Sequence, residues 1–162
     1  MIIPAAGDIA LRLIAATAIG AVIGLDRELR HKPAGLKTHA LVGLGAGLVT
    51  LVTASLTSLE HPDVAAMTRV IQGIIAGIGF LGGGAILKSG DETVLGVTTA
   101  ASIWVVASLG IACGAGEWVA ALIALGIALT VLVAGNYVEK RVLNGRGESA
   151  LPRPSDSGPA RP

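Results

Sequence analysis

The chain has 162 residues, of which 52% are hydrophobic, 14% are charged and 2% are aromatic, and 23 are glycines. This scarcity of charge beside many small apolar residues indicates an integral membrane protein and excludes a disordered chain, while a single cysteine, Cys113, excludes a disulfide scaffold. The net charge of +1 provides no basic surface for nucleic acid, so no nucleic-acid partner is expected.

Five apolar segments are long enough to cross a bilayer, whose hydrocarbon core of about 30 Å needs roughly 20 helical residues. They cover residues 9–25, 38–59, 70–87, 94–114 and 118–138. Arg12 lies near one end of the first segment, from which its guanidinium can reach the headgroups. We therefore predict an all-α integral membrane protein, a compact bundle of five transmembrane helices within residues 1–143. Residues 144–162, rich in Gly, Pro and Ser, are predicted to form a disordered cytoplasmic tail.

Basic residues are distributed unequally between the connections. Most lie in the first connection, the third connection and the C-terminal segment, which a five-helix protein places on one side of the membrane. The opposite side receives Arg69 and Arg12. Because cytoplasmic segments are enriched in Lys and Arg, we expect the N-terminus outside and the C-terminus inside.

Glycines four residues apart recur in the first four segments. At this spacing, small residues let helix backbones approach closely in lipid. We expect a tightly packed bundle and a homo-oligomer, most simply a dimer, that uses one of these glycine faces; packing within a single chain is the alternative. The pairs are Gly20/Gly24, Gly43/Gly47, Gly73/Gly77, Gly79/Gly83 and Gly110/Gly114.

Residues 77–84 read GIGFLGGG and have several interpretations. The first six match the dinucleotide pattern G-x-G-x-x-G, but they lie inside an apolar segment without the strand and acidic residue that this fold requires, so no cofactor is expected. The glycines could interrupt the helix and leave backbone groups around a site. A continuous, closely packed helix is the alternative that we favour.

Residues for catalysis or metal binding are scarce. The three histidines, His31, His39 and His61, lack metal-ligand spacing, and Cys113 has no nearby histidine to activate it. No Asp or Glu lies in the middle of a segment, where an ion path would place one. We therefore expect no enzymatic activity and assign no metal ligand. Trp104 lies mid-segment, and its indole N–H is expected to face the bundle.

An ordered set of motifs resembles the MgtC/SapB family. They are Gly24-Leu25-Asp26-Arg27-Glu28, the run from Ala34 to Val42 (AGLKTHALV), the run from Gly77 to Gly84, and Gly96-Val97-Thr98-Thr99-Ala100-Ala101 followed by Trp104. The resemblance implies a multi-pass protein of the bacterial inner (plasma) membrane. The members that gave the family its name are tied to growth at low Mg²⁺ and to survival within macrophages. Longer members carry a soluble domain after the last helix, so this chain resembles the short, SapB-like form.

The resemblance also implies which residues matter. A polar cluster at the cytoplasmic face would contain Asp26, Arg27, Glu28, Lys37 and Thr38, with Glu28 pairing with Arg27 or Lys37. A second group would pack or hydrogen-bond inside the bundle: Gly35, Gly79, Gly82, Gly84, Thr98, Thr99 and Trp104.

Two functions follow. The first is a regulatory protein that binds a membrane-protein partner through helix packing and is linked to Mg²⁺ limitation or membrane energetics, as with the restraint of ATP synthase implied by the resemblance. The second is a small transporter or channel for Mg²⁺ or another solute, acting as an oligomer. The absence of mid-segment acids favours the first function, whereas the glycine-rich third segment keeps the second open.

Overall fold

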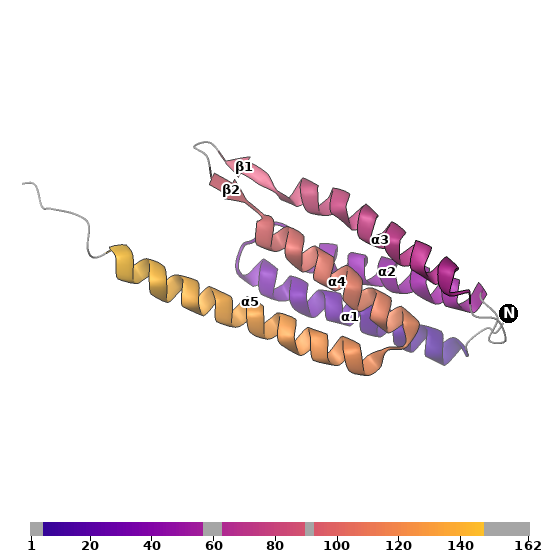
Figure 1. The fold of residues 1–162 in the computed structure, drawn as a ribbon. Helices are drawn as coiled ribbons and strands as arrows, with labels where there is room; N and C mark the ends of the chain where they lie inside the picture. Colours follow the sequence, from indigo (N-terminus) through magenta and orange to yellow (C-terminus); the bar gives the residue numbers. More distant parts are fainter. Residues whose placement is uncertain (1–4, 57–62, 90–92, 148–162) are drawn as a thin grey trace, which may run out of the picture. The chain divides into compact units, whose positions relative to one another are not determined.

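A computed structural model describes residues 5–56, 63–89 and 93–147 (Figure 1). Its described residues contain five helices that are each long and apolar enough to cross a membrane, which confirms the predicted all-helical class. In chain order the elements are α1 (Ala6–Leu29), α2 (Leu36–Leu56), α3 (Val64–Ala85), β1 (Leu87–Ser89), β2 (Thr93–Leu95), α4 (Val97–Ala115) and α5 (Trp118–Gly147).

The chain divides into two compact units. The first, Met1–Ala128, contains α1–α4 and the start of α5, and the second, Leu129–Pro162, contains the rest of α5. The helix α5 extends to Gly147, past the predicted start of the tail at residue 144, and the rest of that segment lies outside the described residues.

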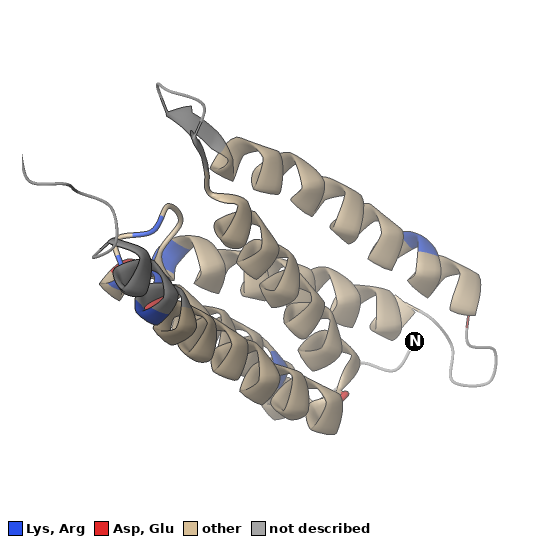
Figure 2. Ribbon diagram, turned by 60° about the vertical axis from the view of Figure 1, so that its left-hand side comes forward, with Lys and Arg blue, Asp and Glu red and all other residues tan. Residues whose placement is uncertain are grey.

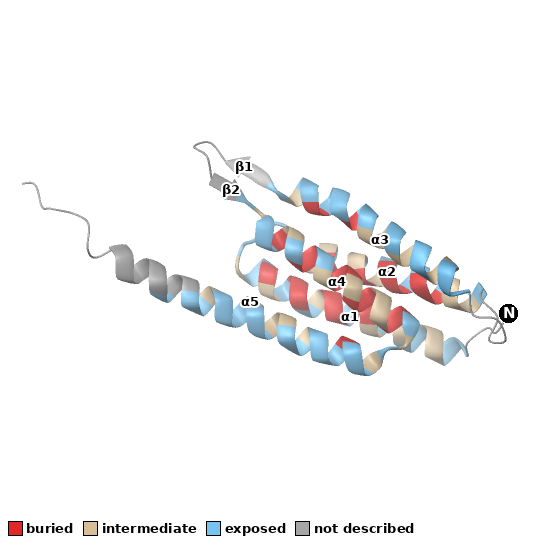
Figure 3. Cartoon of the chain, viewed as in Figure 1, coloured by how far each residue is buried: buried red, intermediate tan, exposed pale blue. Residues whose placement is uncertain are grey.

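Within the first unit, α1, α2 and α4 form the core and α3 packs on its side. Half of the most apolar window of α4 is buried, against only 6% of that of α3. Figure 3 shows the buried residues concentrated on α1, α2 and α4, with α3 largely exposed. Ala16, Ile23, Val106 and Cys113 are each fully buried. The central helix of this unit is therefore α4.

Glycines join the core helices backbone to backbone. A Cβ at Gly20 of α1 would overlap the carbonyl of His39 in α2, and one at Gly43 would overlap the carbonyl of Ala16. A Cβ at Gly110 of α4 would lie 2.5 Å from Gly43 O. The expected tight packing is confirmed here, and these glycines are used within the chain.

The glycines of α3 behave differently. The helix is continuous through residues 79–84, so the interruption considered above does not occur. Close packing of this stretch, the favoured alternative, is correct only at Gly82, whose Cβ would lie 3.5 Å from Ala100 Cβ. Gly79, Gly83 and Gly84 have open space where a side chain would be, because the core helices reach only one side of α3.

The hairpin β1–β2 was not expected from the sequence. Leu87 pairs with Leu95 in antiparallel register, where the apolar pattern placed the ends of two transmembrane segments. Gly96 follows the hairpin with φ of +93°, and a Cβ there would overlap the carbonyl of Ala85. A glycine is required at this turn because other residues rarely adopt that conformation.

Charges gather at the ends of the helices in the first unit (Figure 2). The connection between α1 and α2 carries Arg30 and Lys32, and Arg27 and Lys37 lie in the adjoining helix turns. Near the start of α1, Arg12 Nη1 donates to Gly114 O at 3.0 Å, and Arg12 Nε lies 2.9 Å from Asp8 Oδ2 without hydrogen-bond geometry. Arg12 therefore caps the C-terminus of α4, where a cation is favourable, instead of serving only the headgroups.

Candidate functional site

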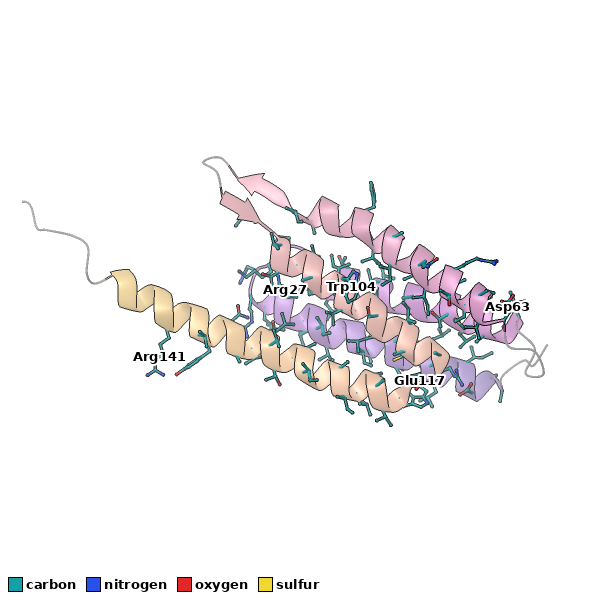
Figure 4. The ribbon with its side chains drawn as sticks, in the orientation of Figure 1. Arg27, Asp63, Trp104, Glu117 and Arg141 are labelled. Atoms are coloured by element: carbon teal, nitrogen blue, oxygen red, sulfur yellow. The ribbon has the colours of Figure 1, made fainter. Side chains whose placement is uncertain are left out.

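The most deeply buried charge in the described residues is Arg27, near the end of α1 (Figure 4). Its side chain is 1% exposed, and its Nη2 donates to Thr99 Oγ1 of α4 at 2.7 Å. Positions 16, 20, 23 and 27 share one face of an α-helix, so the stripe that packs Ala16 and Gly20 into the core also buries Arg27. No carboxylate in the described part of the chain forms an ion pair with it, and Nε has no hydrogen-bond partner there.

A buried histidine lies on the adjacent helix. His39 of α2 is completely buried, with Nδ1 2.9 Å from Gly35 O and Nε2 2.9 Å from Ser102 Oγ of α4. Because a carbonyl oxygen only accepts, Nδ1 carries a proton. The Ser102 hydroxyl also lies 2.8 Å from Thr99 O, so its one proton has two acceptors when the imidazole is neutral.

These side chains form one connected group, which we call the buried polar network: Arg27, His39, Thr99 and Ser102. Thr99 joins its two halves, since its hydroxyl accepts from Arg27 and its carbonyl accepts from Ser102. The network thereby connects α1, α2 and α4 at the end of the bundle that holds the α1–α2 connection. Removing the Thr99 or the Ser102 hydroxyl leaves a nitrogen of Arg27 or of His39 without its partner, so these contacts favour one register of the three helices.

A carboxylate at the end of α1 binds the first backbone N–H of α2 across the connection between these helices. Glu28 Oε2 accepts from the backbone N–H of Leu36 at 2.8 Å and so caps α2. A Cβ at Gly35 would lie 2.7 Å from that oxygen, so a larger residue there would displace the carboxylate from this position. The expected pairing of Glu28 with Arg27 or Lys37 is therefore wrong in the described residues, because its carboxylate serves the helix terminus.

Comparison with known proteins places this architecture in a family. Residues 13–141 match the model of the MgtC family, a range that contains the whole buried polar network. The chain belongs to the MgtC family. No solved structure matches it.

Three relatives illustrate the breadth of the family. SrpB of Synechococcus elongatus is 39% identical over 80% of this chain and 74% of its own length. YhiD of Escherichia coli, named a putative magnesium transporter, is 35% identical over 83% of this chain and 63% of its own. MgtC of Salmonella typhimurium is 42% identical over 82% of this chain and 54% of its own. This MgtC-family chain thus spans only about half of MgtC itself.

In this MgtC-family protein, the residues predicted to form two groups lie in several different parts of the structure. Of the expected polar cluster, Arg27 is in the buried network, Asp26 Oδ1 accepts from Arg30 Nε at 2.8 Å, and Lys37 is exposed. Of the second group, Thr99 joins Arg27, whereas Thr98 is exposed. The remaining predicted positions lie elsewhere: Glu28 and Gly35 at the cap, Thr38 beside a groove between α2 and α3, and Gly79, Gly82 and Gly84 on α3.

One predicted site residue lies differently from the expectation, and two residues of the network were not predicted. Trp104 is half exposed, so the expectation that it faces the bundle is wrong for much of the ring. His39 and Ser102 were missed as site residues. Both are polar residues inside otherwise apolar segments, and this is the signal that could have identified them, since such residues in a membrane usually face a partner.

The network contains a buried guanidinium that donates to a hydroxyl, and this hydroxyl belongs to the residue whose carbonyl accepts from Ser102. No group of three or more His, Cys, Asp or Glu side chains in the described residues could hold a metal ion. Its groups instead fix a guanidinium between three helices. Such an arrangement stabilises one packing of the helices and responds strongly to any change in that packing.

Proposed function

We propose that this protein is a regulatory protein of the bacterial inner membrane that binds another membrane protein and is linked to Mg²⁺ limitation or membrane energetics. The unequal use of glycine carries the proposal. A Cβ at Gly20 of α1, Gly43 of α2 or Gly110 of α4 would meet neighbouring backbone, whereas one at Gly79 or Gly83 of α3 would meet nothing within 4 Å. A helix face of small residues that its own chain leaves open suits a second helix in lipid.

The open face belongs to the outer side of α3. Ala76, Gly79 and Gly83 are all exposed and share a side of the helix opposite the α2–α3 groove. Phe80 beside them is 86% exposed. In the simplest assembly, this face packs against the same face of a second copy, which gives the expected homodimer, and a partner protein would compete for it.

The orientation of the chain in the membrane is part of the same proposal. Lys and Arg gather around the α1–α2 connection and beyond residue 138, and these segments follow the first and the fifth candidate span, which alternating passage through a bilayer puts on one side. The positive-inside tendency then places the C-terminus and the end containing the buried network in the cytoplasm.

A transporter is the second candidate, favoured by the groove of about 660 Å³ between α2 and α3 and by the name of the relative YhiD. Two observations weigh against it. Backbone fills the contacts between α1, α2 and α4, and Mg²⁺ requires octahedral oxygen ligands that it exchanges reluctantly. The residues that line the groove include no carboxylate.

Growth in low-Mg²⁺ medium tests the regulatory proposal. In a strain without its own copy, Gly79→Leu and Gly83→Leu should reach the membrane at wild-type level yet support growth no better than the empty vector, because a bulky side chain prevents helix approach. Gly135→Leu on α5, also at a position with open space, is the matched control and should support growth like the wild type. Full growth with both α3 variants, or no requirement for the wild-type protein, would contradict the proposal.

Magnesium flux decides between the two candidates. Liposomes that contain the purified protein and a Mg²⁺-sensitive dye should show influx no faster than protein-free liposomes. The transporter would become the better proposal if influx is saturable, depends on the protein and is abolished by Thr98→Ala or Gly82→Leu.

A further inference from the structure

A groove runs between α2 and α3 on the side of α3 opposite the Gly79/Gly83 face. It has a volume of about 660 Å³, and most of its lining is apolar. The walls include Leu41, Gly45 and Val49 of α2 and Gly73, Gly77 and Leu81 of α3. We propose that this groove binds one acyl chain of an anionic phospholipid, whose headgroup phosphate is held by Lys37.

Three glycines create the groove. Gly45 in one wall and Gly73 and Gly77 in the other have no atom within 4 Å of the place where a Cβ would be. Elsewhere in the first unit, the glycines between α1, α2 and α4 bring backbones into contact. Here the missing side chains leave space that the chain itself does not fill.

The groove has a charged lining residue at one end only. Lys37 and Thr38 line the groove where α2 begins, and the apolar wall continues from Leu41 to Val49, about 12 Å along the helix axis. Lys37 is exposed, and none of the residues that line the groove is acidic. A cation and a hydroxyl above an apolar slot match the phosphate and the acyl chain of a lipid, and basic pockets at helix ends favour anionic headgroups.

The dimensions favour an acyl chain over a helix. A groove of about 660 Å³ between two packed helices holds an extended chain along its length, whereas a helix about 10 Å across could seat only part of its width there. The exposed Gly79/Gly83 face lies on the other side of α3 and imposes no such limit. The lipid proposal therefore concerns a different surface from the proposed partner face and does not depend on it.

Native mass spectrometry of the full chain in mild detergent tests the proposal with two probes that share the same acyl chains, dioleoyl phosphatidylglycerol and dioleoyl phosphatidylcholine. The wild type should retain one phosphatidylglycerol in preference to phosphatidylcholine. Lys37→Gln should weaken retention of phosphatidylglycerol about five-fold and leave phosphatidylcholine unchanged. Gly77→Leu and Gly45→Leu should lose both lipids because their side chains fill the slot.

The matched control is Gly135→Leu, at an equally open glycine of α5 that does not line the groove, which should retain lipid like the wild type. Equal retention by wild type, Gly77→Leu and Gly45→Leu, each with wild-type thermal unfolding, would overturn the proposal. An unchanged preference for phosphatidylglycerol in Lys37→Gln would also overturn it. A change in oligomeric mass of the groove variants without a change in lipid would assign the groove to a second copy and overturn it as well.

Discussion

Gly20→Ala is expected to destabilise the protein strongly although it adds a single methyl group. That methyl would overlap the carbonyl of His39, and a backbone carbonyl inside a helix cannot move aside as a side chain can. Overpacking of this kind costs about 3 kcal/mol at the upper end of its usual range. For a chain of this size, the unfolding temperature should fall on the order of 10 °C.

Gly79→Ala is the matched control for this prediction. Alanine favours a helix over glycine, and position 79 has open space, so this variant should unfold at or slightly above the wild-type temperature. Thermal unfolding in detergent, followed by size-exclusion chromatography, measures both variants. Equal unfolding temperatures for Gly20→Ala and Gly79→Ala would contradict the close contact between α1 and α2.

Arg27 should respond differently to two substitutions that both remove its charge. Arg27→Ala leaves a cavity and an unpaired Thr99 hydroxyl, and should lower the free energy of unfolding by about 3–5 kcal/mol. Arg27→Met also removes the donor to Thr99, but it keeps most of the volume and removes a buried guanidinium that has no ion-pair partner among the described residues. Because replacing a buried charge by a well-packed apolar group is often neutral or stabilising, this variant should unfold much closer to the wild-type temperature than Arg27→Ala.

The two variants also separate structure from function. If the network acts in regulation, Arg27→Met should fold normally yet fail to support growth in low-Mg²⁺ medium. Arg30→Ala is the control, since it breaks only a partly exposed ion pair with Asp26, worth about 0–1 kcal/mol. Wild-type unfolding of Arg27→Ala would argue against the buried position of the side chain, and wild-type growth with Arg27→Met would make the network purely structural.

The number of helices and the family could be recognised from the chain alone. Length and hydropathy are local properties, so five segments without mid-segment acids were sufficient to predict five spanning helices. The ordered motifs around Arg27, Gly35, Gly79 and Thr99 were sufficient for the family, which the match over residues 13–141 confirms. Spacing likewise predicted that glycine pairs bring helices together, which is correct for Gly20/Gly24, Gly43/Gly47 and Gly110/Gly114.

Only the tertiary structure showed which residues of different helices contact one another. Glycine pairs with the same spacing have opposite roles, Gly43/Gly47 within the core and Gly79/Gly83 on an open face, because the direction of a face depends on the neighbouring helices. Arg27 lies 72 positions from Thr99, and His39 lies 63 positions from Ser102, so no local pattern joins them. Local periodicity determines which helices form, but the few polar contacts inside lipid depend on how the packed backbones bring distant residues together.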